Sequence, residues 1–347
     1  MKFDSFTQDK LEQTKTLFAK FYQKEPLVFL EDRQGFRSRA NFAMYFDDSG
    51  ISYSMFIDGK KTIIKEADFV EDKIKSSMKK LIDLLNGEFK DLSHKLFETR
   101  FATTSHSDKI TLLYHKDLNT INDRLELLQK ELDDIDLVAL SRKQKKAFKD
   151  DFLRHKVKNY NYEFSDECFI QPNLAMNEKM LEFAKTSVKD AKDLLELYCG
   201  YGNFSIYLSD CFDKILATEL SKKAIYFAKK NLLLNDIKNI FFAKLNDKEI
   251  KGAILKEREF NRLKDVNLDD FNFSHILVDP PRCGLGECVD FVAMFENIIY
   301  ISCNPRTAIL DLEYLTKTHK LEKLAFFDQF KNTPHLECGM ILKIKKD

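Results

Sequence analysis

The stretch LLELYCGYGNF, running from Leu194 to Phe204, decides the fold of the C-terminal half of the chain. Its first residues predict a strand, and Gly200 and Gly202 follow directly after it. Glycine suits such a turn because its backbone adopts positive φ and allows close approach to a ligand. The stretch therefore predicts a strand, a ligand-binding turn and the start of a helix.

Strands and helices alternate on both sides of this stretch. The predicted strands are Asp193–Leu197, Lys214–Glu219, Ile240–Ala243, His275–Asp279 and Ile298–Ser302, with two last strands near 321–328 and 338–345. The predicted helices are 173–188, 204–210, 221–234 and 305–317. Such alternation is typical of an α/β domain whose mostly parallel sheet is covered on both faces.

The N-terminal half has a different pattern. Turn residues separate short alternating runs, which predicts an antiparallel meander. The expected strands are Leu27–Leu30, Arg37–Phe46, Ile51–Ile57, Lys61–Ile64, Leu96–Thr103 and Ile110–His115, with helices near 8–24, 71–86 and 119–133. We therefore expect an α+β domain over residues 1–165 and the α/β domain over residues 166–347.

Composition excludes several classes of protein. Lysine plus arginine equals aspartate plus glutamate, at 56 each, so the 347-residue chain has no net charge. Its seven cysteines include no CxxC pair, which argues against a disulfide framework, a zinc site or an iron–sulfur cluster. The sequence has no apolar run long enough for a membrane span and no signal peptide, so we expect a cytoplasmic protein.

A neutral chain can still bind nucleic acid through a local patch. Residues 142–158 are rich in lysine and arginine, and Tyr160, Tyr162 and Phe164 follow them. This segment is compatible with a solvated helix and connector, and equally with a stripe that contacts RNA phosphates.

The glycine turn favours one kind of ligand. Only Gly200 and Gly202 fit the GxGxxG pattern of dinucleotide sites, and the bulky Phe204 leaves little room for a pyrophosphate. S-adenosylmethionine, which has no phosphates, is the better fit. Glu219 ends the next predicted strand, where a carboxylate can bind ribose hydroxyls, although it could also be an ordinary acid at a helix start.

Two further motifs follow strands that end at the same edge of the predicted sheet. Asp279-Pro280-Pro281 leaves one strand, and Cys303-Asn304-Pro305 leaves the next. A lone cysteine is usually a small buried hydrophobe. Cys303, however, precedes a predicted helix start, where the helix dipole should favour the nucleophilic thiolate.

These motifs together resemble the RNA uracil-5-methyltransferase family. The shared segments are Asp279–Arg282 with Gly284 and Leu285, Tyr300–Pro305, and Thr333–Cys338. Other segments are similar to the bacterial tRNA branch of the family: Arg37–Phe42, His94–Phe97, Phe169–Asn173 and Arg258–Leu263. The resemblance covers the chain from Arg37 to its C-terminal end.

The resemblance implies a Rossmann-like S-adenosylmethionine methyltransferase domain preceded by an RNA-binding domain. It implies that Cys303 is the nucleophile and Glu337 the proton acceptor, whereas the expectation of no metal and no iron–sulfur cluster rests on the cysteine pattern. The implied cofactor-binding residues are Gln171, Tyr198, Asn203, Glu219 and Asp279. The expected partner of a monomeric enzyme is the tRNA T-arm, with uridine 54 as the target, and other RNAs with a T-like loop remain possible substrates.

Arg39 and Phe97 are candidate RNA contacts, although an exposed surface arginine and a core phenylalanine are equally compatible with the sequence. Two residues depart from the family pattern: Cys283, where a small residue such as serine is common, and Lys331, where proline is usual.

Three alternatives stay open. The chain could be a related rRNA uracil-5-methyltransferase, although these often carry an OB-like module or a four-cysteine cluster. It could be a tRNA-folding protein whose methylation is incidental. It could also be a nitrogen methyltransferase, which needs no covalent cysteine, so that activity surviving Cys303→Ala would favour this last reading.

Overall fold

The computed structural model describes residues 5–57 and 59–346. The chain forms two compact units, which are described separately. Unit 1 comprises the chain up to Asp32, Glu167–Phe169, and the chain from Ala175 onwards. Unit 2 comprises Arg33–Asp166 and Ile170–Leu174. The segment before Asp32, which we expected in the N-terminal domain, thus groups with the C-terminal half.

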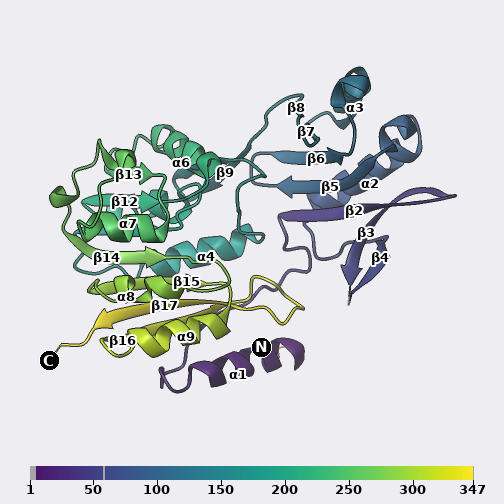
Figure 1. Cartoon of the computed structure of the whole chain (residues 1–347). Helices are drawn as coiled ribbons and strands as arrows, with labels where there is room; N and C mark the ends of the chain where they lie inside the picture. The colour runs from purple at the N-terminus through teal and green to yellow at the C-terminus, as the bar shows by residue number, and fades with distance from the viewer. Residues whose placement is uncertain (1–4, 58, 347) are drawn as a thin grey trace. The chain divides into compact units, whose positions relative to one another are not determined.

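In the described part of unit 1, eight strands form a sheet with the order β1-β16-β17-β15-β14-β11-β12-β13. The strands are β1 (Leu27–Phe29), β11 (Asp193–Leu197), β12 (Lys214–Thr218), β13 (Ile240–Ala243), β14 (Phe273–Val278), β15 (Asn297–Ser302), β16 (His319–Phe327) and β17 (Glu337–Ile344). Strands β11 to β15 are parallel, and β17 is antiparallel to both neighbours. The predicted α/β sheet is confirmed (Figure 1).

The strand order places a switch point between β11 and β14. From β11 the chain continues outward through β12 and β13, whereas β14 leads in the other direction to β15. Ligands bind at the carboxyl ends of strands at such a point. The glycine turn after β11 and the Asp-Pro-Pro motif after β14 therefore lie at the edge where a ligand site is expected.

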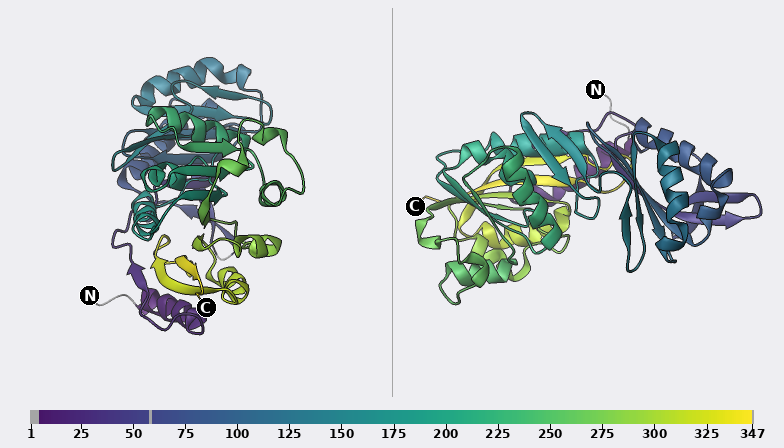
Figure 2. Two further views of the ribbon diagram at one scale, coloured as in Figure 1. Left: turned by 90° about the vertical axis from the view of Figure 1, so that its left-hand side faces the viewer. Right: turned by 90° about the horizontal axis from the view of Figure 1, so that it is seen from above.

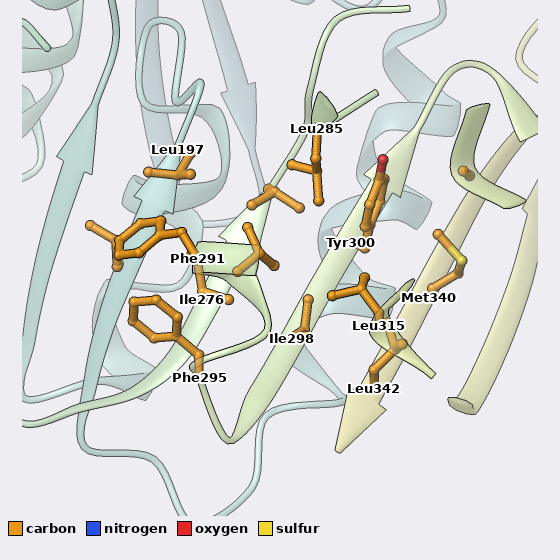
Figure 3. Packing of buried hydrophobic residues seen from close by; sticks show 14 of the residues in the cluster. Leu197, Ile276, Leu285, Phe291, Phe295, Ile298, Tyr300, Leu315, Met340 and Leu342 are labelled. Atoms are coloured by element: carbon orange, nitrogen blue, oxygen red, sulfur yellow. The ribbon is translucent and has the colours of Figure 1, made fainter. Parts of the chain in front are cut away.

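Helices pack against this sheet. Those of unit 1 are α1 (Ser5–Phe18), α4 (Leu174–Lys185), α5 (Asn203–Tyr207), α6 (Lys222–Leu234), α7 (Asp247–Ile254), α8 (Val289–Val292) and α9 (Pro305–Leu315). Helix α1 lies beside α9, although almost three hundred residues separate them (Figure 1). Figure 3 shows Phe291 and Phe295 gathered near Ile276 of β14 in the core of this unit.

Unit 2 contains a seven-stranded sheet with the order β4-β3-β2-β5-β6-β7-β8 and a separate hairpin of β9 and β10. The strands are β2 (Arg39–Asp47), β3 (Gly50–Ile57), β4 (Lys60–Ile64), β5 (Leu96–Thr103), β6 (Asp108–Tyr114), β7 (Ile135–Leu140), β8 (Lys145–Ala147), β9 (Leu153–Val157) and β10 (Tyr160–Phe164). Helices α2 (Asp72–Asn86) and α3 (Asn122–Leu132) share one buried core with the sheet, and Figure 2 shows α2 running alongside the strands. The predicted antiparallel meander is confirmed in β2, β3 and β4.

The basic segment 142–158 is not the helix that one reading of its charges suggested. It contains β8 and β9, and two of its cations have acidic partners. Lys145 lies 3.0 Å from Asp151, and Arg154 lies 2.7 Å from Asp150. The charge of this segment is therefore partly neutralised within unit 2.

Candidate active site

The glycine turn after β11 has the backbone that its sequence predicted. Gly200 and Gly202 have φ values of 56° and 86°. A Cβ at Gly202 would lie 3.0 Å from the Phe242 ring, whereas one at Gly200 would meet no atom within 4 Å. The backbone of Gly200 therefore borders open space, into which a ligand can approach closely.

Glu219 faces this turn from the end of β12. Its carboxylate accepts hydrogen bonds from the backbone N–H of Gly200 at 3.2 Å and of Ser221 at 2.7 Å. The side chain is only partly buried, so its remaining lone pairs can accept bonds from a ligand. The carboxylate is thus fixed beside the glycine turn, where two ribose hydroxyls would fit.

Tyr198 and Asn203 flank the glycines. Tyr198 adopts positive φ, at 61°, and its hydroxyl donates to Asp247 at 2.7 Å. Asn203 begins α5, is largely buried, and exchanges two amide hydrogen bonds with Asn177 at 2.9 and 3.0 Å. Both predicted cofactor residues therefore lie at the glycine turn, and Asn203 is fixed there by its asparagine partner.

Hydrogen bonds join the loop after β14 to the start of α9. The Arg282 carbonyl accepts from the Asn304 side-chain amide at 3.1 Å and from the Thr307 hydroxyl at 3.2 Å. One Asp311 oxygen accepts from the Leu285 N–H at 2.9 Å and from the Tyr300 hydroxyl. These bonds hold residues 279–285 against the turn that carries Cys303.

The thiol of Cys303 is partly buried at the end of β15, next to the N-cap residue Asn304 of α9. Burial raises its pKa, and the nearby carboxylates of Glu337 and Asp279 raise it further. The charge of Arg282 and its hydrogen bond to the thiol oppose this rise. The net direction is opposite to the one expected from the helix N-terminus alone, because burial and the neighbouring acids outweigh the effect of Arg282.

Glu337 begins β17 and is 3% exposed. Burial raises its pKa to about 7, although a hydrogen bond from the Gln329 amide and the charge of Arg282 both lower it. Burial and the neighbouring Glu337 raise the pKa of Asp279 to about 8. A carboxyl group with a pKa near neutrality can accept a proton at physiological pH and release it again.

A cavity of about 690 Å³ opens beside the thiol. Its walls come from the loop after β14, the start of α9, the segment before Glu337, and α1. The lining residues that bear charge or reactive groups are Lys10, Arg282, Cys303, Arg306 and His335. The volume and the largely apolar walls with a few charged groups suit a planar ligand with polar edges, such as a nucleobase.

Three predicted site residues belong to unit 2. Gln171 is buried, and with the half-buried Arg39 it lines one small pocket. Phe97 is stacked on the exposed His115 ring, with centroids 3.9 Å apart and an interplanar angle of 10°. Phe97 is therefore half-buried, and not the core phenylalanine that the sequence also allowed. Gln171 stays a predicted cofactor residue.

Sequence reasoning assigned no role to three other residues near Cys303 and Glu337. Arg282 belongs to the motif Asp279–Arg282, so its charge could have been connected with the thiol. Nothing in the sequence marks Gln329 or Lys10, because only the fold brings Gln329 to Glu337 and Lys10 to Asp328.

Within the described residues, no group of three or more histidine, cysteine, aspartate or glutamate side chains is placed to hold a metal ion. None of the described helices combines the length and the apolar character that crossing a membrane requires.

Comparison with known proteins identifies the relatives of this chain. The sequence profile described as tRNA (uracil-5-)-methyltransferase matches residues 2–345. A tRNA/tmRNA (uracil-C(5))-methyltransferase of Campylobacter lari is 48% identical over 346 residues, covering 97% of this chain and 99% of the relative. One of Aliarcobacter butzleri with the same name is 40% identical, covering 97% of this chain and 93% of the relative.

Among solved structures, the Pyrococcus abyssi tRNA (uracil-54, C5)-methyltransferase bound to S-adenosyl-L-homocysteine matches with a TM-score of 0.77. The match covers 99% of this chain and 84% of that one, at 19% sequence identity. At this identity the likeness concerns the fold.

Proposed function

Because this chain belongs to the tRNA (uracil-5-)-methyltransferase family and is an S-adenosylmethionine-dependent methyltransferase, we propose that it methylates carbon 5 of uridine 54 in the T-loop of tRNA. The relatives' names include tmRNA, so a tmRNA with a T-like loop is a second proposed substrate. Cys303 is the proposed nucleophile and Glu337 the proposed proton acceptor.

The glycine turn fits the methyl donor. Open space borders Gly200, and Glu219 offers carboxylate oxygens beside it. S-adenosylmethionine supplies an electrophilic methyl group on its sulfonium. Tyr198, Asn203, Glu219 and Asp279 would hold it at the carboxyl ends of β11, β12 and β14, and Gln171 is a further proposed contact.

One observation supports the proposed mechanism: Glu337, Asp279 and Arg282 all act on the pKa of Cys303. These groups belong to the carboxyl ends of β14 and β15 and to the start of β17. Carbon 5 of uracil is a poor nucleophile, so a bond from the thiolate to carbon 6 is needed to raise its electron density. A base must then remove the carbon 5 proton. These four residues include one for each task.

The Cys303 thiolate adds to carbon 6, and the electron pair of the C5–C6 double bond moves into an enolate that Arg282 can stabilise. The enolate electron pair at carbon 5 forms the bond to the methyl group, while the S–CH3 bond of the sulfonium breaks and S-adenosylhomocysteine leaves. Glu337 removes the proton at carbon 5, the double bond forms again, and the C6–S bond breaks, which restores the thiolate. The raised pKa of Glu337 suits this proton transfer.

The target base must leave its stack to reach Cys303, at a cost of a few kcal/mol. We propose that unit 2 binds the T-arm through Arg39 and through the stacked Phe97 and His115 rings, since exposed aromatic groups are platforms for unpaired bases. Lys116, Arg142 and Lys143 line a neighbouring hollow of about 430 Å³ and supply positive charge for phosphates.

The test is methyl transfer from labelled S-adenosylmethionine to unmodified tRNA. Label should enter the wild-type transcript but not one in which cytidine replaces uridine 54. Cys303→Ala should abolish transfer to the wild-type transcript. Label on both transcripts would reject the target nucleotide, and full activity of Cys303→Ala would reject the covalent mechanism and favour a nitrogen methyltransferase. Transfer only to rRNA fragments would show that the substrate is rRNA and not tRNA.

A further inference from the structure

Lys10 of α1 is a buried lysine that directs its ammonium group into the loop before Glu337. Its side chain is 4% exposed, and Nζ lies 2.6 Å from the carboxylate of Asp328, which is 1% exposed. The same nitrogen donates to the carbonyl oxygens of Phe330 at 3.3 Å and Thr333 at 3.2 Å. All three acceptors belong to residues 328–336, which connect β16 to β17.

An ammonium group has three N–H donors and no acceptor. Asp328, Phe330 and Thr333 together account for the three donors of Lys10. The ammonium therefore has no donor left for an RNA phosphate, although Lys10 contributes to the wall of the cavity beside Cys303.

The loop that Lys10 holds carries the partner of Glu337. Gln329 follows Asp328 directly, and its side-chain amide donates to the Glu337 carboxylate. The loop also continues into Glu337 itself, because β17 begins there. A displaced loop would change both the position of this carboxylate and its hydrogen bond from Gln329.

We propose that Lys10 is a positioning residue for proton removal: by holding residues 328–336 from α1, it fixes Gln329 and the Glu337 carboxylate at the target base. This inference rests on the proposed role of Glu337. It gives α1 a role in the reaction through the loop before Glu337. The proton is removed after the methyl group has been transferred, so a defect at Glu337 delays the release of Cys303 from the RNA.

The experiment compares Lys10→Met with wild type on unmodified tRNA. We expect kcat to fall at least tenfold, with KM for S-adenosylmethionine and for tRNA changed less than threefold. The fraction of enzyme recovered as a denaturant-resistant adduct with RNA should rise, because methylated RNA stays covalently bound to Cys303 until the proton at carbon 5 is removed. Hydrogen exchange of backbone amides in residues 328–336 should accelerate, while that of α9 stays unchanged.

Lys15→Met is the matched control, since Lys15 lies on the same helix and pairs with Glu12 and Glu25 instead of the loop. It should behave as wild type. Asp328→Asn should reproduce the kinetic effect of Lys10→Met in part, and the double variant should be no worse than Lys10→Met, because residues that act as one unit are not additive. Thermal unfolding of each variant verifies that it folds.

Unchanged kcat and unchanged loop exchange in folded Lys10→Met would overturn the inference. A raised KM for tRNA with unchanged kcat would also overturn it, because Lys10 would then contact RNA. If wild type transferred no methyl group to any RNA, the proposed function would fail, and loop exchange alone would still decide whether Lys10 holds the loop.

Discussion

The thiol and the carboxylate of the candidate site are held by two differently built regions. The loop after β14 is tied to α9 by the bonds of Asn304, Thr307 and Asp311, which join residues 22 to 26 positions apart. The loop before Glu337 depends on Lys10, 318 positions away from Asp328. The nucleophile therefore has local support, whereas the loop before the proposed base is held by a residue far away in the sequence.

The largest expected effect is that of replacing Glu337, the proposed base. Glu337→Gln keeps the shape of the side chain but removes its ability to accept a proton. Turnover should fall by roughly 10²–10⁴, the usual contribution of a general base, and the RNA adduct should accumulate. Quantifying the adduct on denaturing gels checks this, with Cys303→Ala forming none. Wild-type turnover of Glu337→Gln would show that Glu337 is not the base.

Arg282 acts electrostatically on groups of both regions, so its removal should affect both. Its charge lowers the pKa of Cys303 and of Glu337. Both groups must be ionised to react, so wild-type turnover should rise with pH through the Glu337 pKa of about 7 and continue to rise toward the raised pKa of Cys303. Arg282→Met raises both pKa values, which moves this rise to higher pH.

At pH 7 we expect Arg282→Met to lose about tenfold to a hundredfold in kcat, as removal of a charged hydrogen bond predicts. Part of the loss should be recovered at pH 9, which a pH profile of kcat measures. An equal loss at every pH would show that Arg282 acts by binding the RNA and not through these pKa values.

Gly284 tests the local support of the thiol. It has a φ of 77°, and a Cβ there would lie 2.8 Å from the Asp311 carboxylate. Gly284→Ala should lower stability by about 1–3 kcal/mol and reduce kcat several-fold. Gly286→Ala is its control, because Gly286 also has positive φ, at 54°, but no atom within 4 Å of the added methyl group. Equal effects in denaturant unfolding would mean that the contact with Asp311 is unimportant.

Lys331 should give the smallest effect. It stands where the family usually has proline, and its ammonium donates to the Asp32 carbonyl at 2.8 Å. Because this contact is near the surface, Lys331→Met should change kcat less than about twofold and stability by about 0.5 kcal/mol or less. A loss comparable to that of Lys10→Met would mean that the loop is held mainly from its exposed side.

The elements that sequence could predict are those determined by local pattern. The glycine turn, the Asp-Pro-Pro motif and Cys303 each follow an apolar strand, so their meeting at one sheet edge followed from the alternation of strands and helices. The strand Ile135–Leu140 was missed, and β1 was not expected in the large sheet, because its partner Ala325 lies near the other end of the chain.

The electrostatics of Cys303 could not be predicted from sequence for a related reason. A helix N-terminus is visible in the pattern of Cys303-Asn304-Pro305, but the carboxylates of Glu337 and Asp279 approach the thiol only in three dimensions. The same is true of Lys10, whose role depends on α1 lying against the loop before β17.

The order of synthesis gives the placement of α1 and β1 a further consequence. These elements are translated before unit 2, and their partners in β16 and the following loop are translated after it. At roughly 5–20 residues per second, about 15–60 s pass between the synthesis of Lys10 and that of Asp328, and the whole of unit 2 is translated in this interval. The nascent chain can fold unit 2 first, but the loop that carries Gln329 to Glu337 is complete only after all of unit 2 has been translated.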